Sequence, residues 1–203
     1  MKFYNSIGPN PQVVRMFAAE KGITLDMEQV DLLKGENRQA AHLRRNPAGQ
    51  TPALELDNGT YVSEITAICE YLEEKHPSPA LIGATPEERA ETRMWVRRFD
   101  ENVVWPMLSG FRYAEGAPLF TGRIPVYPDI APQLKALAQD RQKWIDGMLS
   151  GRTYFCGDRF TLADILAYCM IAFAISVGQP INADAANLQA WFARVKSRPS
   201  AAA

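Results

Sequence analysis

The feature that most constrains the fold is a change in sequence character at the proline-rich segment Ser78–Pro86. Before this segment, short candidate strands alternate with helical patterns. After it, only helical patterns remain. A chain of 203 residues has room for two small domains. We therefore expect an α/β domain over residues 1–80 and an all-helical domain over residues 87–203, joined by a short linker.

The N-terminal half shows the order β-α-β followed by β-β-α. Asn58-Gly59 is a strong signal for a tight hairpin turn. Ile65, Ile68 and Leu72 have the spacing of one helix face. The expected elements are a strand at Lys2–Asn5, a helix at Gln12–Lys21, an extended segment at Thr24–Leu32, a hairpin over Ala53–Val62, and a helix from Ile65 that ends before Pro77.

The C-terminal half begins with Thr85 as the expected N-cap of a helix that runs to about Val104, where Trp105-Pro106 should kink or break it. Further helices are expected at Gln133–Leu149, from Thr161, and at Leu188–Val195. Thr161 and Asp164 form a capping-box pair, so we interpret Asp164 as structural. The apolar run Ile165–Val177 is too short to cross a bilayer and indicates a buried helix.

Composition narrows the functional class. Lys plus Arg number 22 and Asp plus Glu number 23, so no global positive charge favours nucleic acid. The three cysteines, Cys69, Cys156 and Cys169, show neither a disulfide framework nor metal-ligand spacing. The N-terminus has no apolar stretch typical of a secretory signal. We expect a cytoplasmic protein without a bound metal.

Five motifs in order along the chain resemble cytosolic glutathione transferases, in the atypical theta-like branch of bacterial and fungal enzymes. They are Lys34-Gly35-Glu36-Asn37, Asn46-Pro47-x-Gly49-x-Thr51-Pro52, Glu64-Ile65-Thr66-Ala67-Ile68 with Tyr71-Leu72, Phe160-Thr161-Leu162-Ala163-Asp164, and Arg198-Pro199. The resemblance implies a thioredoxin-like α/β domain followed by an all-α domain. It also implies a homodimer that uses glutathione as co-substrate. From the charge balance and the short apolar runs we expect no nucleic-acid or membrane partner.

The resemblance places the cysteinyl part of glutathione on the main chain of Thr51. It implies that the bond to Pro52 is cis, whereas a trans proline opening a strand is the alternative. Gln50 is expected near the glycyl end.

The same resemblance assigns the charged ends of glutathione. Glu64 should accept the γ-glutamyl ammonium, and the N–H of Ile65 and the hydroxyl of Thr66 should meet the γ-glutamyl carboxylate. Asn37 and Arg38 fall where related proteins contact the glycine carboxylate. Ordinary roles as a helix-start acid and a solvated loop remain the alternatives for Glu64 and Arg38.

The thiol-activating group departs from the family pattern, because Pro9 or Asn10 stands where related proteins carry serine. Lowering a thiol pKa by two units takes about 2.7 kcal/mol. A helix N-terminus supplies roughly 0.3–1 kcal/mol, and one charge-assisted hydrogen bond adds about 1.5–3 kcal/mol. The candidate donors are Asn10, Ser6, a nearby main-chain N–H, an ordered water, and Tyr113 from the helical domain. The alternative for Ser6 and Asn10 is a role as turn formers.

The resemblance also implies that residues on both sides of Pro106 line a pocket for the second substrate, with core packing or surface exposure as the alternative. These residues are Trp105, Met107, Leu108, Ser109, Phe111, Arg112 and Tyr113.

The predicted function is conjugation of glutathione to small hydrophobic electrophiles. Cysteine is absent from residues 1–68, which argues against thiol redox chemistry at the first helix. A maleylacetoacetate isomerase is less favoured, because its Ser-Ser-Cys motif is missing from residues 6–12. A non-catalytic glutathione-binding or regulatory protein is the alternative from a different class.

Overall fold

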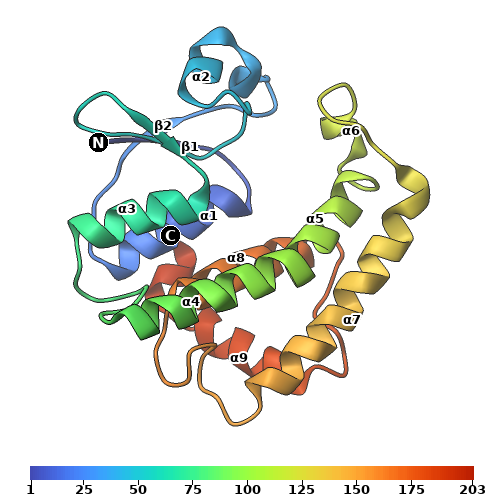
Figure 1. Cartoon of the computed structure of the whole chain (residues 1–203). Helices are drawn as coiled ribbons and strands as arrows, with labels where there is room; N and C mark the ends of the chain where they lie inside the picture. The colour runs from blue at the N-terminus through green and yellow to red at the C-terminus, as the bar shows by residue number, and fades with distance from the viewer. The chain divides into compact units, whose positions relative to one another are not determined.

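A computed structural model describes residues 1–203, which form two compact units (Figure 1). Unit 1 comprises Met1–Ala84 together with Pro199–Ala203, and unit 2 comprises Thr85–Arg198. No helix in the chain combines the length and the apolar character needed to cross a membrane.

Unit 1 is built on a four-stranded mixed sheet in the order β2-β1-β3-β4. β1 pairs with β2 in parallel, and β3 is antiparallel to both β1 and β4. The order of the elements along unit 1 confirms the predicted β-α-β segment followed by a β-β-α segment. The elements are β1 (Lys2–Asn5), α1 (Pro9–Glu20), β2 (Asp26–Gln29), a 3-10 turn at Glu36–Arg38, α2 (Ala40–Arg45), β3 (Ala53–Glu55), β4 (Tyr61–Ser63) and α3 (Ile65–Lys75).

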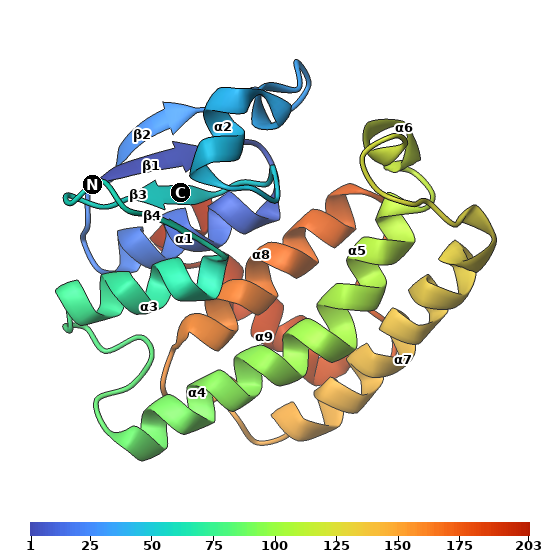
Figure 2. The same cartoon turned by 45° about the horizontal axis from the view of Figure 1, so that its top comes forward.

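The two faces of this sheet are covered by different helices (Figure 2). α1 and α3 lie side by side on one face, and α2 lies toward the other. Phe3 and Leu54 are cross-strand partners with no exposed surface. Their neighbours Tyr4 and Ala53 point to the opposite face, because side chains alternate along a strand. There the guanidinium of Arg45, from the end of α2, lies 3.9 Å from the centre of the Tyr4 ring.

The last residues of the chain, Pro199–Ala203, belong to unit 1 and form a 3-10 turn that packs on α1. The hydroxyl of Ser200 donates a hydrogen bond to the carboxylate of Glu20. The sequence pattern groups these residues with the helical half, because this short segment, mostly alanine, carries no signal for the surface on which it packs.

Unit 2 is entirely helical apart from short bridges in its loops. It comprises α4 (Pro86–Phe99), a π-helical turn (Asp100–Val104), α5 (Trp105–Arg112), α6 (Ala117–Phe120), a 3-10 turn (Pro128–Ile130), α7 (Ala131–Leu149), α8 (Leu162–Ser176) and α9 (Ala186–Lys196).

The expected interruption at Trp105-Pro106 takes the form of the π-helical turn. The N–H of Trp105 donates to the C=O of Asp100, five residues back. Pro106 has no N–H and would leave a gap in a regular α-helical ladder. The wider turn lets the chain pass this position without a break between α4 and α5.

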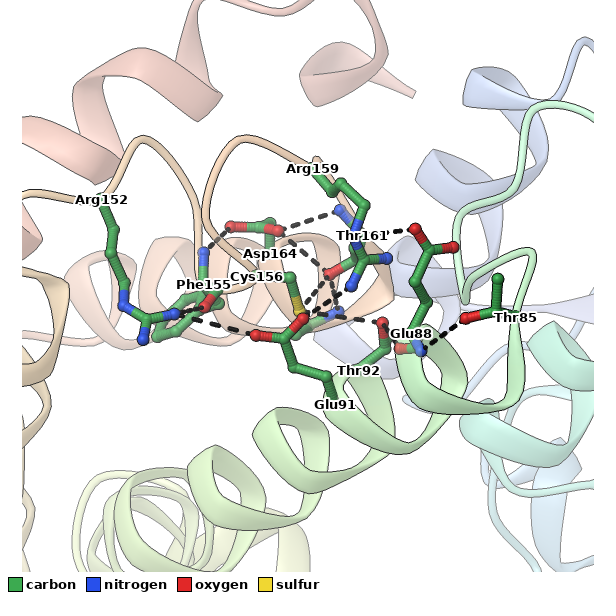
Figure 3. A network of polar contacts seen from close by, with 11 residues as sticks. Thr85, Glu88, Glu91, Thr92, Arg152, Phe155, Cys156, Arg159, Thr161 and Asp164 are labelled. Atoms are coloured by element: carbon green, nitrogen blue, oxygen red, sulfur yellow. Dashed lines mark hydrogen bonds and ion pairs between the residues drawn. The ribbon is translucent and has the colours of Figure 1, made fainter.

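α8 is the central helix of unit 2, and the capping box predicted at its start is present (Figure 3). Asp164 is fully buried and accepts hydrogen bonds from the N–H of Thr161 at 3.0 Å, the N–H of Phe155 at 3.1 Å and Nε1 of Trp191 at 2.8 Å. Burial raises the pKa of Asp164 to about 6, against the opposing effect of these hydrogen bonds. Asp164 therefore joins the 151–160 loop, α8 and α9, in agreement with a structural role.

Candidate active site

Several predicted binding residues meet at one end of the sheet in unit 1. Ser6 follows β1, Thr51 lies just before β3, and Glu64 follows β4. Because β3 runs antiparallel to β1 and β4, these positions share one end. Continuing the β1–β3 pairing by two residues places Ser6 opposite Thr51. Continuing the β3–β4 pairing by one residue places Pro52 opposite Glu64.

The bond between Thr51 and Pro52 is cis, as predicted. Thr51 is largely buried, and its hydroxyl is hydrogen-bonded to that of Ser6. No hydrogen bond within the chain uses the main-chain N–H or C=O of Thr51. The main chain of Thr51 is therefore available to a ligand at this end of the sheet.

Ser6 is buried, and its hydrogen is already engaged. Its hydroxyl donates to the C=O of Ile7 at 3.0 Å, since a carbonyl can only accept. The hydroxyl of Thr51 then donates to Ser6. In this arrangement Ser6 supports Thr51 and has no second hydrogen to offer to a sulfur atom.

Asn10 lies in the first turn of α1, which follows Gly8 as N-cap. Pro9 and Pro11 have no N–H, so Asn10 alone among the first three helical residues carries a main-chain donor. The first turn contains no acidic residue, and no side chain caps the helix. The positive end of α1 is therefore open to an anion.

α3 begins at the same end of the sheet and also has an uncapped start without acidic residues in its first turn (Figure 2). Its N-cap, Glu64, has φ of 70° and is the only non-glycine residue of the chain with positive φ. Such a conformation costs on the order of 1–3 kcal/mol and is concentrated at functional sites. The side chain of Glu64 is exposed, and Ile65 and Thr66 are half-buried beside it.

The loop before Thr51 is held by side chains from the preceding segment. Asn37 donates to the C=O of Gly49 at 2.6 Å, and Arg38 donates to the C=O of Ala48 at 3.3 Å. Asn37 is buried and Arg38 is exposed. The two residues predicted at the glycyl end thus lie against this loop, and the next residue along it, Gln50, is exposed.

His42 was not predicted as a site residue. It is buried, at 2% exposure. Its Nε2 lies 2.8 Å from the C=O of Gln50, which also accepts from Nδ2 of Asn46 at 3.0 Å. The four-residue spacing of His42 and Asn46 was the available sequence signal, but α2 has no clear apolar period to reveal it.

In unit 2, the predicted acceptor residues follow the π-helical turn. Leu108 and Ser109 are buried, whereas Trp105 is 58% exposed. Phe111 makes edge-to-face contacts with Phe120 and Phe173.

Arg112 and Tyr113 end α5. The guanidinium of Arg112 lies 5.7 Å from the centre of the Phe120 ring, no carboxylate pairs with it, and burial lowers its pKa. The ring of Tyr113 contacts Tyr127 edge-to-face at 5.6 Å. Within this group, Arg112 is the cation without a partner anion.

Comparisons with known proteins agree with this architecture. Residues 7–75 match the family model of the glutathione S-transferase N-terminal domain, and residues 132–199 match that of the C-terminal domain. The chain is 32% identical over 199 residues to glutathione S-transferase 2 of Saccharomyces cerevisiae, which covers 95% of this chain and 84% of the yeast protein. The solved structure of yeast Gtt2 superposes with a TM-score of 0.90 at 31% identity, over 98% of both chains.

Two bacterial structures are also similar. A glutathione S-transferase domain-containing protein of Marinobacter aquaeolei has a TM-score of 0.92 and 36% identity, over 98% of this chain and 99% of that one. A Gtt2-class glutathione S-transferase of Vibrio parahaemolyticus has a TM-score of 0.82 and 28% identity, over 98% and 95%. The chain thus has the thioredoxin-like domain and all-helical domain of the glutathione transferase fold, and it belongs to the glutathione S-transferase family of enzymes, in the theta-like branch with the Gtt2-class proteins.

Proposed function

We propose that this protein conjugates the thiolate of glutathione to small hydrophobic electrophiles. The sulfur lone pair forms the new C–S bond, and the displaced electron pair moves to a leaving group or to an adjacent electron-withdrawing group. The observation that carries the proposal is the end of the sheet in unit 1, where two uncapped helix starts flank the free main chain of Thr51.

The charges at this end are complementary to those of glutathione. The exposed carboxylate of Glu64 accepts the γ-glutamyl ammonium, and the first N–H groups of α3, at Ile65 and Thr66, donate to the γ-glutamyl carboxylate. Arg38 and Asn37, beside Gln50, receive the glycine carboxylate. The N–H and C=O of Thr51 pair with the cysteinyl residue, ahead of Pro52.

Asn10 is the proposed donor to the sulfur. A free thiol has a pKa near 8.5 and is mostly protonated at pH 7. The main-chain N–H and the side-chain amide of Asn10 both lie at the positive end of α1. One hydrogen bond to a charged group, worth about 1.5–3 kcal/mol, lowers a thiol pKa by roughly one to two units. Ser6 is the weaker candidate, because its hydrogen is engaged with Ile7.

The second substrate is proposed to bind on unit 2, against the side chains at the end of α5. Tyr113 supplies a hydroxyl group there, and Trp105, Phe111 and Arg112 supply apolar and cationic surface. The other two predicted acceptor residues, Leu108 and Ser109, are buried. We also propose that the protein is cytoplasmic and that it forms a homodimer. Light scattering on a size-exclusion column tests the homodimer through its molar mass.

Binding to immobilised glutathione tests the first half of the proposal, and ultraviolet titration of the bound thiol tests the second. If the protein is an active enzyme, immobilised glutathione retains it, and the thiol of bound glutathione is ionised near neutral pH. Retention with an unshifted thiol would favour the non-catalytic binding protein, and no retention would exclude both functions.

A further inference from the structure

Three successive carbonyl groups ahead of Thr51 are held by side chains from Asn37–Asn46. The C=O groups of Ala48 and Gly49 each accept from one side chain, whereas that of Gln50 accepts from two, His42 and Asn46. Both donors come from α2 and its C-cap, and both are at least 97% buried. The carbonyl of Gln50 is therefore the most firmly fixed of the three.

The same peptide unit carries the N–H of Thr51. The bond between Gln50 and Thr51 is trans, since the chain has cis bonds only before Pro52 and Pro79. In a planar trans peptide the C=O and N–H point in opposite directions. Two donors on the Gln50 oxygen therefore direct the Thr51 N–H away from α2. They also polarise the peptide and strengthen that N–H as a donor.

We propose that His42 and Asn46 are positioning residues that orient the Gln50–Thr51 peptide so that the Thr51 N–H can donate to glutathione. Neither side chain needs to touch the ligand. The proposal rests on the proposed binding of glutathione at Thr51, but the orientation itself is a property of the free protein.

Three variants separate this role from general stability. His42→Leu removes one donor to Gln50. His42→Gln keeps an N–H near the position of Nε2 and should rescue the function. Asn46→Asp removes the second donor but keeps Oδ1 as acceptor for the N–H of Ala48, which lies 3.1 Å away. The only other histidine, exposed His76, supplies the matched control His76→Leu.

The first measurement is the residual dipolar coupling of the Thr51 N–H in the partially aligned free protein, relative to the other amides of unit 1. We expect the coupling to change in His42→Leu and Asn46→Asp and to stay at its original value in His42→Gln and His76→Leu. An unchanged coupling in both of the first two variants would overturn the inference, whether or not glutathione binds.

The second measurement is the dissociation constant for glutathione. When one of the two donors to Gln50 is lost, the Thr51 N–H is no longer held in the direction of the ligand. Binding of glutathione should then weaken about tenfold, as expected for loss of one net hydrogen bond from Thr51 to glutathione. KM for glutathione should rise while kcat at saturating glutathione stays within about twofold, since only positioning of the bound tripeptide is affected. Wild-type affinity in both His42→Leu and Asn46→Asp would overturn the inference. A wild-type protein that does not bind glutathione would instead refute the proposed function, and the dipolar couplings would still decide the orientation.

Discussion

Nζ of Lys21 lies 2.6 Å from a carboxylate oxygen of Glu73, and both side chains are shielded from water, at 0% and 3% exposure. The ammonium also donates to the C=O groups of His76 and Pro79, at 2.7 and 2.6 Å. Glu73 accepts from the N–H of Ile82 at 2.8 Å. This buried pair links the end of α1 and α3 to the segment 76–82.

Removing one member of this pair should strongly destabilise the protein. Lys21→Met leaves the Glu73 carboxylate buried without its cation, and such losses typically cost about 3–5 kcal/mol. Chemical denaturation followed by circular dichroism measures the change. Lys143→Met, which removes the exposed partner of Asp184, is the control and should leave the unfolding midpoint unchanged. Equal midpoints for both variants would contradict a stabilising role of the Lys21–Glu73 pair.

Asp164 should make stability depend on pH in a defined direction. Its pKa is about 6 in the folded state and near 3.8 in the unfolded chain. Between these values the folded state binds more protons, so the contribution of Asp164 to stability falls as pH rises from about 4 to about 6. The change is on the order of 3 kcal/mol.

Asp164→Asn removes this titration, so the stability of wild type relative to the variant should rise as pH falls from 7 to 5. Urea unfolding of both proteins at the two pH values measures the difference. A pH-independent difference would mean that the pKa of Asp164 is not raised by folding.

Gly49 and Gly59 provide a matched pair for testing the loop before Thr51. Both have positive φ, at 61° and 80°. A Cβ at Gly49 would lie 2.8 Å from Nη1 of Arg38 and 3.1 Å from the C=O of Asn37, whereas a Cβ at Gly59 would meet nothing within 4 Å. Gly59→Ala should cost roughly 1–2 kcal/mol through its backbone conformation alone. Gly49→Ala should cost more and also weaken glutathione binding, as measured by thermal unfolding and calorimetric titration. Equal costs in the two variants would argue against a close approach of Asn37 and Arg38 to Gly49.

Asn10→Ala should raise the pKa of the bound glutathione thiol by about one unit, because it removes one donor and leaves the main-chain N–H in place. Ser6→Ala should shift it less, since the Ser6 hydrogen is engaged with Ile7. Ultraviolet titration of the thiolate in each binary complex measures both shifts. A larger shift in Ser6→Ala than in Asn10→Ala would reverse this assignment.

Arg112 should favour electrophiles that carry a carboxylate. Its guanidinium is largely removed from water and has no partner anion. Arg112→Met should lower kcat/KM for a carboxylate-bearing electrophile by about tenfold or more, as expected for one charge-assisted hydrogen bond. A neutral electrophile of similar size should be affected much less. Arg97→Met, which changes an exposed arginine paired with Glu101, is the control. An equal loss for both electrophiles would assign Arg112 to packing.

Local signals determined much of this structure from the sequence alone. The N-cap Thr85 accepts from the N–H of Glu88, and the capping box of Thr161 and Asp164 is present. The hairpin turns at Asn58-Gly59, where the N–H of Thr60 donates to Asn58. These features depend on residues within four positions of each other, so their residue types predict them directly. The cis bond before Pro52 came from the family resemblance of the surrounding motif.

Other features were decided by contacts between distant residues. The Lys21–Glu73 pair joins positions 52 residues apart, and Ser200 reaches Glu20 across 180 residues. The sequence gives no partner for the hydroxyl of Ser6. In the structure, the β1–β3 pairing brings this hydroxyl against that of Thr51. His42 can donate to the C=O of Gln50 because the turn after α2 brings Gln50 back beside it. Sequence spacing specifies which groups are available within a helix or turn, whereas the partner of a buried polar group is chosen by tertiary packing, because burial without a hydrogen bond is costly.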